Sequence, residues 1–253
     1  MKRPLKIGLI LAGAVILTAL TIAANVARSH SQVHGIDVSI RCVGTPQLVD
    51  EQVVADSILA ALPHLYATRV GDVNRDKVVS AAMHVPFIEE ASASVSVSGK
   101  VVVKTKQRRP IARVFYGKRE LYMDENGAMF PTSKIAECNV LVASGEFTEP
   151  LVIDSLNSQM QALLEVAKFL DLNKNYSILI DQLYIESDGN IMMVSKLGDN
   201  TIELGDASNL NEKFSNLWTF YRKGMPRAGW NTYNKISLKY NGQVVCTKDK
   251  KQQ

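Results

Sequence analysis

The hexapeptide Gln107-Arg108-Arg109-Pro110-Ile111-Ala112 marks the point at which the sequence changes character. Before it, strand-like and helical segments alternate between proline and glycine breaks. After it, short runs of alternating apolar and polar residues are separated by turn clusters such as Asn126-Gly127 and Asn241-Gly242. The sequence therefore predicts an α+β protein with two folded parts, residues 36–107 and residues 108–247.

The first part, residues 36–107, is predicted to follow the order strand, helix, helix, strand, strand. Apolar and polar residues alternate over 36–42, as in a half-buried strand. Helical spacing follows over 48–62, and a second helix begins after Asn74, whose side chain can cap it. Two strands then meet at a turn through Gly99. The side chains expected to face the core are Ile36, Val38, Ile40, Cys42, Val54, Ile58, Ala61, Leu62, Val78, Val79, Ala82, Met83, Val95, Val97, Val101, Val103 and Thr105.

The second part, residues 108–247, is predicted to be a mainly antiparallel sheet interrupted by two helices. Ser208 is a candidate cap for the second of these helices, and Gly224 and Pro226 are expected to end it. The apolar stripes at helical spacing are Met160, Leu163, Leu164, Ala167 and Leu170 in the first helix, and Leu210, Phe214, Leu217, Trp218 and Tyr221 in the second.

Residues 7–27 carry no charge, and this length is close to the ~20 apolar residues that cross a bilayer as a helix. Lys2, Arg3 and Lys6 precede them. The positive-inside rule then places the tail, residues 1–6, in the cytoplasm and everything after the helix outside it. We expect a single-pass inner-membrane protein with a juxtamembrane segment over 28–35 and periplasmic domains.

A cleaved signal peptide is the alternative interpretation of this segment. The apolar region of a signal peptide is usually ~7–15 residues long and ends at a small-x-small cleavage site. Here the run is longer, and Asn25 or Ile22 would stand where a small residue is needed. The anchor is therefore the favoured interpretation.

Composition excludes some functions. The chain has 46% hydrophobic and 21% charged residues, a composition typical of globular proteins. Its net charge is +4, and its basic residues do not form one cluster, so we expect no nucleic-acid partner. Three cysteines, Cys42, Cys138 and Cys246, lack zinc-site spacing. Isolated thiols are favoured over a disulfide, whose pairing the sequence does not specify.

Four segments carry a resemblance to the FtsQ/DivIB family of bacterial division proteins. Pro86-Phe87-Ile88 enters a strand of the first part, and residues 107–112 resemble the family's acidic-Arg-x-Pro-x-Ala junction, with Gln107 in place of the acid. Tyr122 to Gly127, with Pro131 beyond, is similar to its Tyr-x-Asp-x-x-Gly stretch. Residues 236–240 resemble its apolar-Asp-Leu-Arg-Tyr strand, with serine replacing the aspartate.

The resemblance implies a POTRA (polypeptide-transport-associated) domain over 36–107 and the family's β-domain over 108–247, with a flexible tail over 248–253. It further implies a non-enzymatic scaffold at the division septum that bridges early and late division proteins. In the family, the small bitopic partners FtsB and FtsL bind the last strands of the β-domain.

The residues themselves indicate no catalytic, cofactor or metal site. The segment from Asp124 to Gly127 lacks the carboxylate ladder of a calcium loop and predicts a β-turn. The four histidines have no metal-ligand spacing, and the signatures of nucleophile elbows, phosphate loops and penicillin-binding enzymes are missing. Residues 107–109 could bind an acidic ligand, but a solvated face or protection of a strand edge is the favoured interpretation.

The segment of residues 236–246 is predicted to be one strand at a sheet edge, where a partner can add a strand of its own. An internal hairpin strand is the open alternative. Tyr240 is expected to be the main contact residue for the partner, because such aromatic residues often dominate the binding energy of an interface. The predicted partner-binding residues are Ile236, Leu238, Tyr240, Val244 and Val245.

Two rival functions remain open from the sequence. One is a membrane-anchored envelope enzyme whose active site is built from scattered residues. The other is a secretion-system assembly subunit that uses the same anchor-plus-module design.

Overall fold

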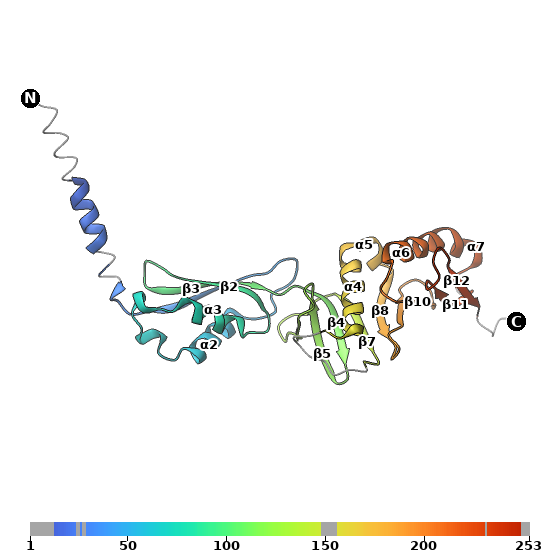
Figure 1. The fold of residues 1–253 in the computed structure, drawn as a ribbon, viewed down its shortest axis with the longest axis horizontal. Coiled ribbons are helices and arrows are strands. Elements are labelled where there is room, and N and C mark those ends of the chain that lie inside the picture. The colour runs from blue at the N-terminus through green and yellow to red at the C-terminus, as the bar shows by residue number, and fades with distance from the viewer. Residues whose placement is uncertain (1–12, 24–25, 27–28, 148–155, 231, 249–253) are drawn as a thin grey trace, which may run out of the picture. The chain divides into compact units, whose positions relative to one another are not determined.

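The computed structural model describes residues 13–23, 26, 29–147, 156–230 and 232–248 (Figure 1). The chain divides into two compact units. The first contains the residues up to 43 together with 47–108, and the second contains 44–46 and the residues from 109 onward. Both units combine helices with a sheet, so the predicted α+β class is confirmed.

From residue 35 onward, the first unit is a three-stranded sheet with two α-helices, and two short 3-10 turns, Leu65–Ala67 and Val70–Asp72, lie between these helices. The sheet order is β1-β3-β2, with β3 parallel to β1 and antiparallel to β2. The element order, strand, helix, helix, strand, strand, is the one that the periodicity predicts. The elements are β1 (Gly35–Arg41), α2 (Glu51–Ala61), α3 (Arg75–Met83), β2 (Ile88–Val95) and β3 (Lys100–Gln107).

The core of this unit lies between the helices and one face of the sheet. Val54 and Ile58 of α2 are fully buried, as predicted, and the side chain of Asn74 caps α3 by accepting from the amide of Lys77 at 3.0 Å. Three predicted core residues are wrong. Ala61 is exposed at the end of α2. Met83 is 38% exposed at the end of α3, and Val97 is 81% exposed because β2 ends two residues earlier and the chain turns there.

The junction residues 107–109 are neither a solvated face nor the protection of a strand edge, so that interpretation was wrong. Because β3 is the central strand, Gln107 is buried, and its Oε1 accepts from the backbone N–H of Leu48 at 2.6 Å. Arg109, in the second unit, donates to the carboxylates of Glu125 at 2.7 Å and Asp171 at 2.8 Å.

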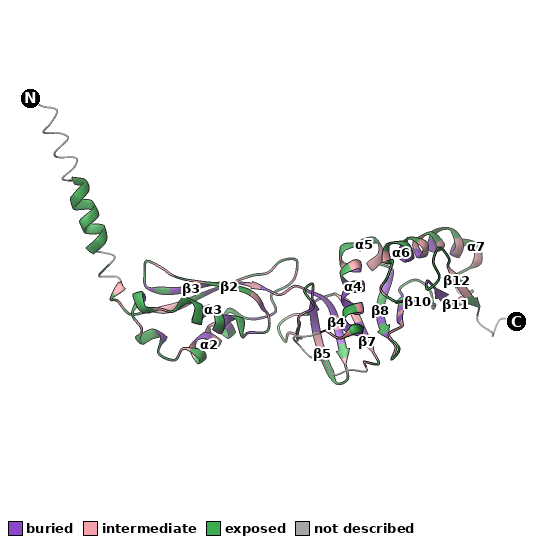
Figure 2. Cartoon of the chain, viewed as in Figure 1, coloured by how far each residue is buried: buried purple, intermediate pink, exposed green. Residues whose placement is uncertain are grey.

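The second unit is built on a nine-stranded sheet in the order β12-β11-β10-β9-β8-β7-β4-β5-β6. Among the described residues, five of its eight strand pairings are antiparallel and three are parallel, which agrees with the predicted mainly antiparallel sheet. Figure 2 shows β4 mostly buried, whereas buried and exposed residues both occur along β8. The strands are β4 (Pro110–Tyr116), β5 (Arg119–Asp124), β6 (Met129–Pro131), β7 (Leu141–Gly145), β8 (Ile180–Ile185), β9 (Ile191–Ser195), β10 (Thr201–Gly205), β11 (Tyr233–Ser237) and β12 (Val245–Lys248).

Helices cover this sheet. The predicted stripe of α4 is entirely buried, and Asn157 caps that helix by accepting from the amide of Met160 at 2.8 Å. Phe214 and Leu217 of α6 are fully buried in the same core. The helical elements are α4 (Ser158–Leu172), α5 (Lys174–Ser177), α6 (Leu210–Thr219), a π-helical turn (Phe220–Gly224) and α7 (Met225–Ala228).

Both predicted ends of α6 were wrong. Ser208 does not cap it: its hydroxyl and amide bond to Asp206, and the helix begins after Asn209, whose φ is 50°. The helical path also does not stop at Gly224 or Pro226. A π-helical turn over Phe220–Gly224 connects α6 to α7. Pro226 lies in the first turn of α7, where a proline costs no hydrogen bond.

The predicted β-turn after β5 is confirmed. The Oδ1 of Asp124 accepts from the amides of Asn126 at 2.8 Å and Ala128 at 2.9 Å, and the Gly127 amide donates to the Asp124 carbonyl at 3.0 Å. Gly127 has a φ of 82°, which glycine adopts without strain. The acidic side chain therefore serves the turn.

The predicted anchor, residues 7–27, lies partly outside the described residues. Its described stretch, 13–23, is helical and exposed. Within the part of the chain that the structure describes, no helix has the length and apolar character needed to cross a membrane. The predicted tail over 1–6 is outside the described residues, whereas Val33, in the predicted juxtamembrane segment, is already buried in the first unit.

Candidate partner-binding edge

Strand β12 forms one end of the nine-stranded sheet. It pairs antiparallel with β11, with Ile236 opposite Cys246 and Ser237 opposite Val245. Among the described residues no strand pairs with its other side. The backbone N–H and C=O groups on that side are thus available to an added strand.

The prediction of a single strand over 236–246 was wrong, because the segment is a hairpin. β11 ends at Ser237 and β12 begins at Val245. The connection turns at Gly242, whose φ is 69°, and the Gly242 amide donates to the carboxylate of Glu212 in α6 at 2.9 Å. The Asn241-Gly242 pair was the sequence signal for this turn.

The structure separates the five predicted binding residues. Ile236 is fully buried and Leu238 is 2% exposed, so both side chains belong to the core. Val244 is half-buried against the same core. Tyr240 is 58% exposed in the connection, and Val245, at 41% exposure, is the one that lies on the edge strand itself.

Thr247 and Lys248, both exposed on β12, were missed by the sequence reasoning. The signal that could have found Thr247 is its alternation with Val245. Thr247 lies opposite Lys235 and Val245 lies opposite Ser237, on one face of the sheet, whereas Cys246 faces the core beside Ile236. An added strand would therefore meet Val245 and Thr247 on the open face.

The open face beside this edge is basic. The carboxylate of Glu203 in β10 lies 3.1 Å from the ammonium of Lys235 and 3.7 Å from that of Lys239. Burial alone would raise the pKa of Glu203, but the neighbouring Ser237 hydroxyl and the two ammonium groups together outweigh burial, and the pKa is lowered. The single carboxylate of Glu203 thus forms ion pairs with two half-exposed lysines, so these three side chains together leave one net positive charge next to β12.

The hairpin is held against α6, and an ion pair fixes the start of that helix. The Lys213 ammonium, almost fully buried, donates to Oδ1 of Asp206 at 2.6 Å and to its carbonyl at 2.9 Å. The hydrogen bond from Lys213, with a further one from Ser208, lowers the pKa of Asp206 to about 2.

We expect Asp206→Asn to lower the free energy of unfolding by about 0.5–1 kcal/mol at pH 7, a small value because the Asp206 side chain is 74% exposed. A carboxyl whose pKa is depressed in the folded state stabilises above its unfolded pKa and loses that effect as pH falls through about 2. The difference between the two proteins should therefore close between pH 4 and pH 2 in urea titrations. Asp199→Asn, an exposed aspartate in the β9–β10 turn, should show no such closing.

The described residues offer little else for chemistry. Among them, no group of three histidine, cysteine, aspartate or glutamate side chains could hold a metal ion. The three cysteines are free thiols, and burial raises the pKa of each. The free side of β12 is therefore the feature of this unit that suits binding of a partner.

The sequence profile described as "FtsQ/DivIB, C-terminal related" matches residues 109–247, more than half of the chain and nearly all of the second unit. A search of curated proteins found no match.

Proposed function

Because this chain belongs to the FtsQ/DivIB, C-terminal related family and so has a role in cell division, we propose that it is a non-enzymatic scaffold of the division machinery. It bridges early and late division proteins. By holding several partners together it raises their effective concentration for one another, which needs no catalytic group.

Its partners in this proposal are small bitopic proteins like FtsB and FtsL, which add a strand to β12. The free side of β12 is the observation that carries the proposal. The lysines at 235 and 239 favour a partner segment with carboxylates on the open face. Val245 and Thr247 are the side chains that such a strand would contact, and Tyr240 stands in the connection before them.

The order of the elements and the charge pattern of the sequence support the assignment of the other parts of the chain. The strand, helix, helix, strand, strand order of the first unit supports a POTRA domain over 36–107. The uncharged residues 7–27 after Lys2, Arg3 and Lys6 support an inner-membrane anchor with both units in the periplasm. The proposed location is the division septum.

The proposal is tested with the full chain in growing cells that carry a photo-crosslinking amino acid at position 245. We expect a crosslink to a bitopic division protein. Val194 is the matched control, because it lies on the same open face and is also 41% exposed, but on β9, inside the sheet. Equal crosslinking from both positions would contradict strand addition at β12.

Depletion separates the rival functions. Filamentous cells without septa support the scaffold, whereas lost export with normal septa would identify a secretion subunit. An activity that survives purification and disappears with one aspartate, histidine or serine substitution would identify an enzyme.

A further inference from the structure

Two large apolar side chains next to the short helix α5 are exposed. Leu172, at the end of α4, is 81% exposed and Ile178, just after α5, is 65% exposed. They are the most exposed large apolar side chains among the described residues of the second unit, although Leu170 and Leu179 close by are buried. Leu172 lies two residues before α5 and Ile178 directly after it, so both ends of this short helix carry an exposed apolar group, and neighbouring exposed apolar groups can mark an interaction site.

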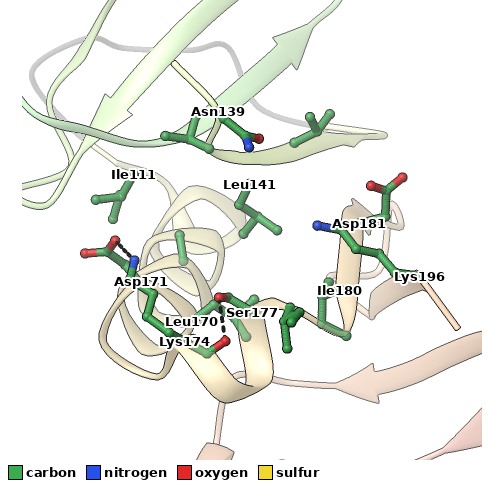
Figure 3. Close-up of a pocket in the computed structure, with 14 residues that line it drawn as sticks. Ile111, Asn139, Leu141, Leu170, Asp171, Lys174, Ser177, Ile180, Asp181 and Lys196 are labelled. Atoms are coloured by element: carbon green, nitrogen blue, oxygen red, sulfur yellow. Dashed lines mark hydrogen bonds and ion pairs between the residues drawn. The ribbon is translucent and has the colours of Figure 1, made fainter. Parts of the chain in front are cut away.

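Two hollows flank α5. One, of about 360 Å³, is lined by Leu172, Tyr176 and Trp218 among others, and the second, of about 350 Å³, lies on the other side of the helix. Lys174 lines both. Figure 3 shows the second hollow, with Ile111 and Leu141 facing Lys174 and Ser177 across it. We call Leu172, Lys174, Tyr176, Ile178 and Trp218 the α5 corner.

The floor of the corner is a cluster of packed aromatic rings. The Tyr176 ring stacks on Phe169 of α4 at a centroid distance of 5.9 Å, and it contacts the rings of Phe214 at 5.5 Å and Trp218 at 6.3 Å. Phe214 is fully buried. A surface already held in place loses little conformational entropy when a partner binds, so its apolar groups contribute more to affinity.

Lys174 is the one charged side chain among the described residues that line the hollow beside Trp218, whereas Lys168 lines a neighbouring hollow together with Glu165 and Glu212. Lys174 is 75% exposed; Lys168 precedes Leu172 by one helical turn, and Arg222 follows Trp218 by one turn. No described carboxylate forms an ion pair with Lys168 or Arg222. The carboxylate of Asp171 is already bound to Arg109 at 2.8 Å and to Lys174 at 2.9 Å.

We infer that the α5 corner is a second docking surface, which binds an acidic amphipathic helix of another division protein. Apolar side chains of that helix cover Leu172 and enter the hollow beside Trp218, and its carboxylates face Lys174 and the neighbouring cations. A partner cannot add a strand here, because β8, against which α5 packs, already has strands on both sides. We therefore assign the other common mode, in which an amphipathic helix lies in an apolar groove. This surface is separate from β12.

The test begins with proteins captured from division-stage membranes by the full chain. The probes are overlapping 20-residue peptides that cover the extramembrane parts of each captured protein. We expect the full chain to bind a peptide that is acidic and amphipathic at helical spacing, and Leu172→Ser with Ile178→Ser to abolish that binding. Ile135→Ser, which replaces another exposed isoleucine of this unit at 52% exposure, should leave it intact.

Charge reversal makes the test specific. Lys174→Glu should weaken binding of that peptide at least ten-fold, and a peptide with one carboxylate changed to lysine should recover it. Lys118→Glu, at an exposed lysine in the β4–β5 turn, should have no effect. Val245→Glu should also have no effect, because it alters only the β12 edge.

The inference is overturned if the binding peptide is basic or extended, or if Lys174→Glu leaves its binding unchanged. It is also overturned if the chain self-associates in a way that the Leu172 and Ile178 changes abolish, or if the corner binds phosphatidylglycerol vesicles in place of any peptide. If the corner variants keep all partners while Val245→Glu loses one, the second surface is wrong and the β12 proposal stands.

Discussion

Val245→Glu should weaken capture of the bitopic partner at least ten-fold while the chain stays folded. The Val245 side chain is 41% exposed on the free edge strand, so a carboxylate there is solvated in the unbound chain. On strand addition, the same carboxylate would be desolvated against the partner, which we expect to carry acidic groups near Lys235 and Lys239. Ten-fold corresponds to about 1.4 kcal/mol of binding free energy, and interface residues at hot spots exceed this.

The measurement is partner binding by the full chain, with its thermal unfolding midpoint recorded in parallel. Val194→Glu places the same charge on the same sheet face at equal exposure, but away from the edge, and should retain the partner. Tyr240→Ala tests the connection separately, with about 2 kcal/mol expected if that ring is a hot spot. Retained binding by a folded Val245→Glu protein would mean that the docking edge lies elsewhere.

Phe214→Ala should lower the free energy of unfolding of the second unit by about 3–5 kcal/mol. The Phe214 ring is fully buried in α6 and packs on Phe169 at 5.0 Å and on Tyr176 at 5.5 Å. Removing it leaves a cavity where α4, α5 and α6 meet, and close-packed neighbours relax only partly into such a space.

Urea unfolding followed by tryptophan fluorescence measures this effect in the full chain, because both tryptophans, Trp218 and Trp230, belong to the second unit. Phe115→Ala is the control, since that phenylalanine of β4 is 40% exposed and its loss should cost far less. Similar midpoints for Phe214→Ala and the unmodified chain would show that the aromatic cluster does not hold these helices together.

Much of the fold could be predicted because its signals are local. The buried stripe of α4 repeats at helical spacing, and the Asn74 cap lies beside the first turn that it serves. The turn at Gly127 needs only its own residues and the preceding aspartate. In each case the physical cause lies within a few residues of its effect, so one sequence suffices to find it.

The ends of α6 and the course of the last strands could not be predicted in this way. Ser208 looks like a cap, but its side chain bonds to Asp206, which is held in turn by Lys213. The strand predicted over 236–246 breaks at a turn that α6 fastens through Glu212, 30 residues from Gly242. Alternation of apolar and polar residues persists on both sides of such a break, so it does not distinguish one strand from two.

The sequence by itself determined the two-part organisation, the type and order of most elements and the resemblance to the division family. Only the tertiary structure decided which strands are central and which lie at an edge. β3 became the middle of its sheet, which buries Gln107 against Leu48, and β12 rather than the longer predicted strand became the free edge. The reason is that strand neighbours are chosen by pairings between distant segments, and the local pattern of a strand is the same whether one or both of its sides are paired.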